Sequence, residues 1–288
     1  MSTFFEHVKV PQVLMGVELI DKGLVNKTYI DLCNDIKKVV LSMYYHITPE
    51  RVLPAKTFGT YFPPLFENPN KFIIPQPELI PVLKKLKDQG KFLFIATNSH
   101  YEYTELIMEA TLGPKWRESF DFVFSSCRKP LFFTAKNPMY ICDTSNPHFK
   151  GRKLETFLDL VPDSSITYLE GNHTFLEGFL SHHFNKKVPE IAFFGDQYTS
   201  DVSFSHSLPG WSGIAIIEEM SLREEEYKVI EQALPFAPMD LQLVKYDKYW
   251  SEDYFQIDGI KNYFVHQVSK QSRYAIPLVR YIVNMIDW

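Results

Sequence analysis

The sequence predicts an α/β fold, a parallel sheet with helices on both faces. Three short apolar runs, residues 92–96, 122–124 and 191–194, have the length of buried strands. Amphipathic stretches with helical spacing separate them, and this alternation is typical of a parallel sheet covered on both faces. Ligands of such sheets bind beyond the carboxyl ends of the strands. The residues that follow each run are therefore where function is expected.

Helical periodicity opens the chain. Val13, Leu14, Val17 and Ile20 share one helical face, and a second amphipathic stretch covers residues 29–45. An irregular Pro- and aromatic-rich connector is predicted at 53–77, followed by a helix at 79–86 with Gly90 as its C-cap and another helix from Tyr101. After the third apolar run, a helix and then a strand at 213–217 are predicted. A last helix leads to Leu234 and begins with a capping box of Ser221 and Glu224.

Composition excludes several classes of protein. The formal net charge of −5 and the scattered basic residues argue against a nucleic-acid or membrane-surface binder. The cysteines Cys33, Cys127 and Cys142 lack metal-ligand spacing, so we expect reduced thiols and a cytoplasmic protein. The N-terminus MSTFFEHVKVPQ does not have the pattern of a secretion signal, and no apolar stretch approaches the roughly 18 residues of a membrane span. A soluble protein is expected.

The turn Thr97-Asn98-Ser99 follows the first apolar run. Hydroxyl and amide groups at a strand-to-helix turn can bind an anion together with the free N–H groups of the helix start. The same residue types are also favoured as plain helix N-caps. Both readings stay open for this triplet.

The segment Arg128-Lys129-Pro130 follows the second run. A cation at this position can neutralise a phosphate or a carboxylate, a task that suits the compact charge of Lys. The alternative is a solvated basic residue in a loop.

Two carboxylates follow the third run. Asp196 comes directly after Phe194-Gly195, and Asp201 stands five residues on. Paired acids at a strand end suit Mg²⁺, which prefers one or two carboxylates together with water and phosphate oxygens. A turn residue and a helix cap are the alternative interpretations.

The three motifs occur in the order T-N-S, R-K-P-x-F-F and G-D-x-x-x-x-D. This set resembles the haloacid-dehalogenase-like (HAD-like) phosphohydrolases and, more narrowly, the cytosolic purine 5′-nucleotidases and the 5′-nucleotidase domain-containing proteins, in particular the branch of domain-containing protein 1. The phrases that carry the resemblance, spread over roughly residues 11–220, are KFLFIATNSHYEYTELIM, FDFVFSSCRKPLFF, YLEGNH, IAFFGDQYTSDV and GWSGIAIIEEM. It implies a HAD-like Rossmannoid sheet with a helical cap, of which YIDLCNDIKKVVLSMYYH is similar to a part.

The resemblance also implies roles. Thr97 and Ser99 hold phosphate oxygens and Asn98 shapes the turn, whereas Lys129 neutralises the phosphoryl group. By the same resemblance, Asp196 ligates Mg²⁺ and Asp201 orients the waters of the metal. Asp35 stands where a purine-facing acid lies, although the basic–acidic pair of the family reads Lys37-Lys38 here. The implied ligand is a nucleotide or another phosphomonoester, with neither nucleic acid nor a membrane as partner and with a homo-oligomer left open.

The first motif of this family, an apolar strand ending D-x-D-x-T, has no match in the sequence. Asp21 ends a stretch of helical spacing and is followed at position 23 by Gly, and Asp31 and Asp35 are four residues apart on one helix face. In the family the first Asp of this motif attacks phosphorus and the second is the general acid, and the strand is central in the sheet. The chain is therefore expected to begin inside the cap, truncated at its N-terminus, and to lack turnover.

We predict three parts of the chain: a partial helical cap at 1–55, a HAD-like phosphatase core at 56–240 and an aromatic-rich extension at 241–288 that packs on the core. The expected function is Mg²⁺-dependent hydrolysis of a nucleoside 5′-monophosphate through an aspartyl-phosphate, a step that this chain as written lacks the nucleophile to perform. The alternative is a non-catalytic protein that binds a phosphate ligand or a protein partner. A nicotinamide-dependent enzyme is disfavoured because no G-x-G-x-x-G follows any strand.

Overall fold

The structure is a computed structural model, and it describes residues 16, 18–23, 28–47, 52–54, 62–145, 150–217, 256–257, 260–261, 263–276, 279 and 282. The predicted helical face of Val13, Leu14 and Val17 lies outside the described residues, as does the predicted capping box of Ser221 and Glu224 with its helix.

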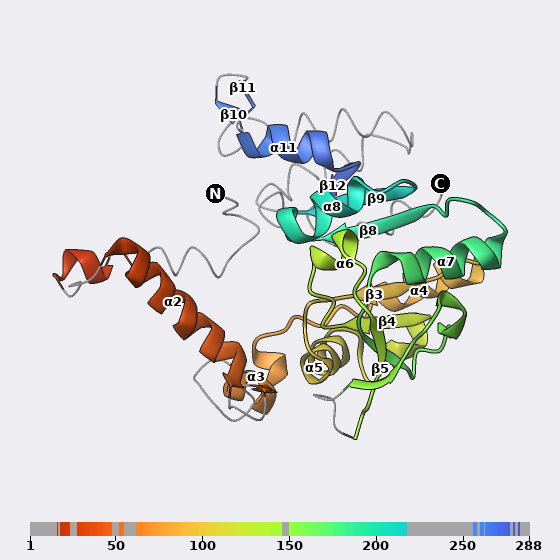
Figure 1. The fold of residues 1–288 in the computed structure, drawn as a ribbon, viewed down its shortest axis with the longest axis horizontal. Coiled ribbons are helices and arrows are strands. Elements are labelled where there is room, and N and C mark those ends of the chain that lie inside the picture. The colour runs from red at the N-terminus through yellow and green to blue at the C-terminus, as the bar shows by residue number, and fades with distance from the viewer. Residues whose placement is uncertain are drawn as a thin grey trace.

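Helices and strands alternate along the described chain (Figure 1). The helices are α2 (Tyr29–Tyr44), α3 (Phe62–Glu67), α4 (Leu79–Asp88), α5 (Tyr101–Leu112), α6 (Leu131–Thr134), α7 (His173–Phe184), α8 (Ser203–His206) and α11 (Tyr263–Gln271), with the short turns η2 (Pro69–Lys71), η3 (Trp116–Ser119), η4 (Phe157–Asp159) and the π-helical η5 (Tyr198–Val202). The strands are β1 (Tyr45–Ile47), β2 (Val52–Pro54), β3 (Phe94–Ala96), β4 (Phe122–Ser125), β5 (Met139–Cys142), β6 (Lys150–Lys153), β7 (Thr167–Glu170), β8 (Ile191–Gly195), β9 (Trp211–Ile216), β10 (Gln256–Ile257), β11 (Ile260–Lys261) and β12 (Tyr274–Ile276).

The strands form a parallel-rich architecture. A five-stranded sheet has the order β3-β4-β7-β5-β6, and a three-stranded sheet has the order β12-β9-β8. The pairs β3/β4, β4/β7, β8/β9 and β9/β12 are parallel, whereas β5 is antiparallel to both β6 and β7. The predicted α/β class and its parallel strands are confirmed. The segment β5–β7, which the sequence analysis did not assign to strands, makes the larger sheet mixed.

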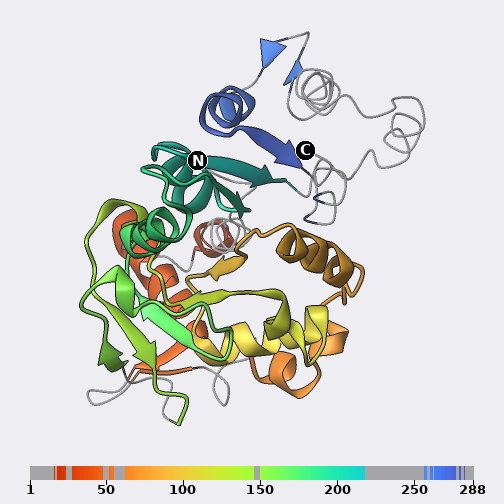
Figure 2. The same ribbon diagram turned by 90° about the vertical axis from the view of Figure 1, so that its right-hand side faces the viewer.

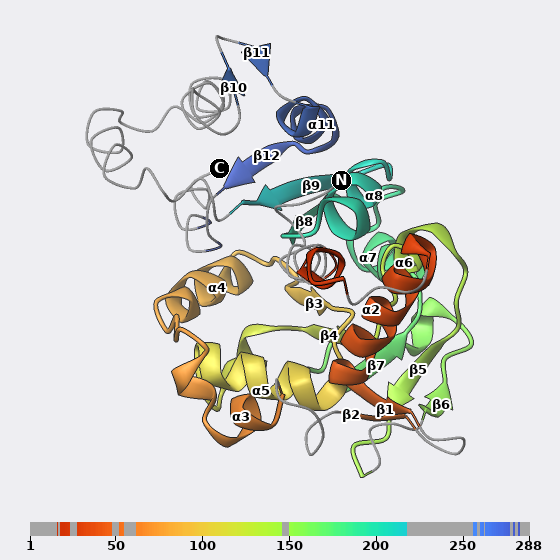
Figure 3. The same cartoon turned by 90° about the vertical axis from the view of Figure 1, so that its left-hand side faces the viewer.

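Helices cover both faces of the larger sheet. The ring of Phe122 in β4 packs edge-on against Phe179 of α7, with 5.1 Å between ring centroids. The next residue, Val123, points to the other face and clusters with Leu79 of α4 and Leu112 of α5. Figure 3 shows α4 and α5 on one side of β3 and β4 and α7 on the other. Side chains alternate across a strand, so each of these neighbours has its own helical layer to contact.

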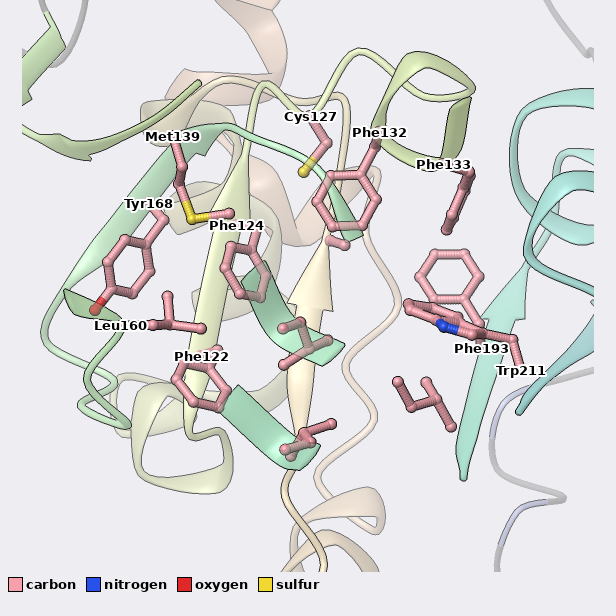
Figure 4. Packing of buried hydrophobic residues seen from close by; sticks show 14 of the residues in the cluster. Phe122, Phe124, Cys127, Phe132, Phe133, Met139, Leu160, Tyr168, Phe193 and Trp211 are labelled. Atoms are coloured by element: carbon pink, nitrogen blue, oxygen red, sulfur yellow. The ribbon is translucent and has the colours of Figure 1, made fainter. Parts of the chain in front are cut away.

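Aromatic rings join the two sheets. Phe94 of β3 stacks on Phe193 of β8 with 6.2 Å between centroids, and Phe94 also lies 6.2 Å from Trp211 of β9. Phe133 of α6 contacts Phe193 edge-on at 5.3 Å (Figure 4). The buried core is therefore continuous from one sheet to the other, and β3 and β8 are the strands that face each other across it.

The predicted strands and the predicted end of the helix at 79–86 have counterparts in the structure. The three apolar runs are β3, β4 and β8, although β3 begins at Phe94 rather than at residue 92. Gly90 ends α4 with a left-handed φ of 75°, and its N–H bonds the carbonyl of Lys87, as its predicted role in ending the helix requires. The connector expected to be irregular contains β2, α3 and η2. Short elements rich in Pro and aromatic residues show too little periodicity to be recognised.

Part of the predicted extension joins the sheet. Strand β12 pairs in parallel with β9, as Figure 2 shows by the blue strand beside the teal one. Val279 packs on the cluster of Leu79 and Trp116. The division into three parts stays a prediction. No helix of the described residues is both long and apolar enough to cross a membrane.

Truncating the core ring of Phe124 is expected to destabilise the fold. The ring is fully buried and packs against Phe94, Phe132 and Tyr168. Phe124→Ala should lower the free energy of unfolding by about 3–5 kcal/mol, because the apolar transfer is lost and a cavity is left. Chemical denaturation measures this change. The control Leu158→Ala, at an exposed position, should stay within about 0.5 kcal/mol of the parent chain.

Candidate active site

The turns that follow β3 and β4 are bonded to each other through the backbone. Thr97 N–H donates to the carbonyl of Phe124 (3.0 Å), and Cys127 N–H donates to the carbonyl of Thr97 (3.0 Å). Ser126 N–H donates to the carbonyl of Ser99 (2.8 Å). The two parallel strands thus end side by side, and their turns continue the pairing beyond the sheet. The T-N-S motif and the R-K-P motif are brought together as predicted from their strand ends.

Asn98 holds the backbone of Lys129. Its Nδ2 donates to the Lys129 carbonyl (3.1 Å), and its Oδ1 accepts from the Lys129 N–H (2.5 Å). Thr97 Oγ1 accepts from the N–H of Ser99 (3.0 Å), which fixes the turn of the triplet. An amide side chain that pairs with both backbone groups of one residue determines the position of that residue closely. Asn98 is therefore tied directly to the loop that carries the cation.

The side chain of Lys129 reaches Asp201. Lys129 Nζ lies 2.8 Å from Asp201 Oδ1, and the two side chains are only 11% and 5% exposed. The ammonium also lies 5.3 Å from the centre of the Phe193 ring, a cation–π contact. A buried ion pair of this kind links the end of β4 to the turn that follows β8.

The electrostatics of Asp201 reflect this burial. Desolvation raises the pKa of Asp201, and the neighbouring charge of Asp196 raises that pKa further, whereas the contact with Lys129 opposes the shift. Two carboxylates and one ammonium therefore share a small volume at the ends of the strands. A buried carboxylate with a shifted pKa and charged neighbours, as Asp201 is here, is typical of functional sites.

Gly195 makes room for Asp201. A Cβ atom built on Gly195 would overlap the Cβ of Asp201. The π-helical turn η5 carries Asp201 back over the end of β8, and Gln197 caps this turn by accepting from the N–H of Ser200 (2.5 Å). Tyr198 extends from the same turn to Gln271 of α11, with an O–H···O distance of 2.5 Å. π-helical turns are rare and occur frequently at functional sites.

Asp196 is an exposed carboxylate directly after β8. Its oxygens, beside those of Asp201, form a donor set of the kind Mg²⁺ accepts, with solvent access for the waters that Mg²⁺ retains. One oxygen of Asp201 already contacts Lys129, so Asp196 fits direct ligation better. Among the described residues, no group of three or more His, Cys, Asp or Glu side chains gathers as a protein-only metal site.

The structure does not bring Asp35 to this cluster. Asp35 lies on α2, where it forms an ion pair with Lys38 of the same helix (3.5 Å). Figure 1 shows α2 set apart from β3 and α6, the elements that flank the cluster. The predicted purine contact of Asp35 stays a prediction.

Comparison with known proteins agrees with this arrangement. A family model described as 5′ nucleotidase family matches residues 2–275. The chain belongs to the 5′-nucleotidase family. It is 25% identical to human 5′-nucleotidase domain-containing protein 1 over 247 residues, 79% of this chain and 53% of that relative. It is 32% identical to human 5′-nucleotidase domain-containing protein 2 over 163 residues, 56% of this chain and 28% of that relative.

The family assignment confirms the resemblance seen in the motifs. The bovine domain-containing protein 1 is also 25% identical over 245 residues. The chain spans about half the length of the curated domain-containing protein 1 relatives and about a quarter of the human domain-containing protein 2. The motif ends of β3, β4 and β8 are therefore those of a 5′-nucleotidase family member.

Two contributors to the site were not predicted in these roles. Gly195 is predicted only as the first residue of the G-D-x-x-x-x-D motif, with no contact to Asp201, and the bond of Asn98 to Lys129 joins residues that are 31 apart in sequence. A glycine directly before Asp196 indicates that another side chain can lie close to the backbone at that position. No local pattern encodes the pairing of Asn98 with Lys129.

Adding one methyl group at Gly195 is expected to displace Asp201. In Gly195→Ala, the new Cβ overlaps the Asp201 side chain, so the turn η5 must shift and the contact with Lys129 must lengthen. Overpacking of this kind should lower the free energy of unfolding by about 1–3 kcal/mol. Denaturant melts measure the loss. Ala192→Ser, at an exposed position of the same strand, is the control and should leave stability unchanged.

The cysteines should differ in reactivity. Burial raises the pKa of Cys127 to about 12 and that of Cys142 to about 11, and Cys33 is exposed. Because the thiolate is the nucleophile, iodoacetamide at pH 8 should alkylate Cys33 and leave the other two unmodified. Peptide mass spectrometry before and after addition of denaturant measures this. Rapid alkylation of Cys127 in the folded protein would contradict the burial of the loop.

Proposed function

We propose that this chain forms the phosphate-binding and magnesium-binding part of a phosphomonoester hydrolase whose substrates are nucleoside 5′-monophosphates or similar phosphomonoesters. The observation that carries the proposal is the buried pair of Lys129 and Asp201 at the end of β8, beside the Thr97-Asn98-Ser99 turn. Family membership supports a nucleotide phosphatase type of activity. A cytoplasmic location, consistent with three free thiols, is part of the proposal.

Each group has a role that its surroundings support. The Lys129 ammonium supplies a positive charge in a largely desolvated place, where its attraction for a phosphoryl oxygen is stronger than in water. The Thr97 hydroxyl accepts from Ser99 N–H, which leaves its own proton to donate to a phosphate oxygen. Asn98 positions Lys129 and does not need to touch the ligand. Positioning and charge neutralisation are the main sources of rate in phosphoryl transfer.

Asp196 is the residue we propose to hold Mg²⁺, with Asp201 behind it. When bound, the ion would neutralise phosphoryl charge and draw the phosphate toward the strand ends. Asp201, paired with Lys129, is suited to orienting water rather than to direct ligation. The acidic pair and the cation together can accommodate both a divalent cation and a dianion.

Turnover requires a nucleophile that this sequence does not contain. In the family reaction a carboxylate attacks phosphorus, the ester oxygen departs with a proton from a second acid, and water then cleaves the acyl phosphate. No D-x-D occurs anywhere in the sequence. Among the described residues, β3 ends the five-stranded sheet and β8 ends the three-stranded sheet, each with a strand partner on one side. We therefore propose that the chain as written binds phosphate without hydrolysing its ester.

The second candidate function is non-catalytic. The same missing nucleophile favours a protein that binds a phosphate ligand or a protein partner and performs no chemistry. Restoring turnover separates the two possibilities. If an upstream coding segment for an apolar strand ending D-x-D is added and the product hydrolyses inosine monophosphate, the hydrolase is correct. If the extended product stays inactive with Mg²⁺, the binding function is correct.

Removing the Lys129 ammonium should weaken phosphate binding. Lys129→Ala is expected to weaken the affinity for inorganic phosphate, measured by calorimetry with Mg²⁺ present, by about 10- to 100-fold, the equivalent of the ~1.5–3 kcal/mol of a hydrogen bond to a charged group. Lys115→Ala, an exposed lysine that pairs with Glu118, is the matched control and should bind as the parent chain does. Equal affinity of the two variants would contradict the proposed role of Lys129.

Asp196 should control the dependence on magnesium. In Asp196→Asn the carboxylate is lost with little change in volume, so phosphate affinity should no longer rise when Mg²⁺ is added. Calorimetry with and without the ion measures this difference. Asp163→Asn, at an exposed acid of the loop before β7, should keep the magnesium effect. A magnesium effect that survives in Asp196→Asn would overturn the metal assignment.

A further inference from the structure

Glu170 is a buried carboxylate that the proposed function does not use. It is the last residue of β7 and only 6% exposed. Its backbone has a left-handed φ of 60°, and the following Gly171 has a φ of 81°. A Cβ at Gly171 would overlap the side chain of Met139. A residue other than Gly keeps a left-handed backbone only where surrounding contacts stabilise it, so contacts of Glu170 must stabilise this conformation.

Two cations hold this carboxylate. Arg128 Nη2 lies 2.7 Å from Glu170 Oε1, and Lys150 Nζ lies 2.9 Å from Oε2. The Glu170 side chain is 8% exposed, whereas that of Arg128 is 62% exposed. The buried partner is therefore the fixed one, and the arginine reaches in from the surface to meet it. A charge-assisted contact to a buried carboxylate is stronger and more directional than a surface pair.

Arg128 precedes Lys129 in a loop with an unusual backbone. Ser126 and Arg128 both have left-handed φ angles, 53° and 56°. Each such residue costs free energy that the surrounding contacts must supply. On the side of β3, Asn98 bonds both backbone groups of Lys129. On the side of β7, the contact of Arg128 with Glu170 is the corresponding anchor.

We propose that Glu170 is a positioning residue: by anchoring Arg128, it fixes the loop 126–130 and so directs the Lys129 ammonium toward Asp201 and the phosphate site. The sheet order supports this, because β4 lies between β3 and β7, and the loop after β4 is thereby held from both neighbours. The ion pairs of Glu170 are with Arg128 and Lys150, so it acts on Lys129 through its neighbour in the loop. The effect on phosphate binding rests on the proposed function, whereas the role of Glu170 in holding the loop rests on the geometry alone.

The first measurement does not involve phosphate. Hydrogen exchange of the amides of 126–129, three of which bond Ser99, Thr97 and Asn98 across the turns, reports the stability of the loop. Glu170→Ala should accelerate this exchange by 10-fold or more. Glu170→Gln keeps the shape and one acceptor for Arg128, and it should show an intermediate effect. Arg152→Ala, which removes an exposed ion pair with Asp159, is the control and should change nothing in the loop. Exchange in Glu170→Ala equal to that of the control would overturn the proposal.

The second measurement is phosphate affinity of the folded protein. With inorganic phosphate and Mg²⁺ as the probe, Glu170→Ala should bind about 5- to 50-fold more weakly, and Glu170→Gln should recover part of the loss. A purely structural role would instead lower the melting temperature and leave the affinity of the folded protein unchanged, which would refute positioning. If the parent chain binds no phosphate, the proposed function fails and hydrogen exchange still decides the inference.

A double-mutant cycle tests whether Glu170 acts through Arg128. If it does, the variant that combines Glu170→Gln with Arg128→Gln should lose no more affinity than the weaker-binding single variant. Multiplicative losses would show independent effects and contradict the inference. Arg128→Gln changes an exposed side chain, so this variant should fold. It therefore tests whether Arg128 positions Lys129 even if Glu170→Ala fails to fold.

Discussion

The buried ion pair of Lys129 and Asp201 is the constraint on which the site depends. Both charges are nearly removed from solvent, so each would be costly without the other. The two residues come from different sheets, Lys129 from the loop after β4 and Asp201 from the turn after β8. Their contact is therefore satisfied only when the two sheets keep a fixed separation. The stack of Phe94 on Phe193 between the sheets supplies that separation.

Most other features near the site follow from holding this pair. Gly195 has no side chain because Asp201 occupies that space, and Gln197 caps the turn that brings Asp201 back over β8. Asn98 holds the backbone of Lys129, so little of the ammonium position is left to side-chain rotamers. The rigid elements are the parallel strands, whose carboxyl ends place all three turns at one edge. Catalysis that depends on the positions of side chains requires rigid elements such as these strands to hold them.

The sequence predicted the strand ends well, because continuous apolar runs followed by polar turns are a local signal. It located Thr97, Lys129 and Asp196 at a common edge for the same reason. It did not predict that Asn98 would bond the backbone of Lys129, nor that β5 and β6 would pair as antiparallel strands. Neither contact follows from the spacing of apolar residues or from a turn motif. Strand β6 has an exposed, charged sequence without apolar alternation, so its pairing is set by β5 and not by its own pattern.

The loop after β4 shows how two buried carboxylates can set the direction of one segment. Arg128 contacts Glu170 of β7, whereas its neighbour Lys129 contacts Asp201 in the turn after β8. Turning Lys129 away would leave the buried Asp201 without the ammonium that contacts it, at a cost of several kcal/mol (about 3–5 for a broken buried pair), whereas Glu170 would keep its contact with Lys150 if Arg128 turned away. Arg128 adopts a left-handed φ of 56° in this arrangement, a conformation that surrounding contacts must stabilise. The loop is thus held by charge-assisted contacts to a buried acid on each side.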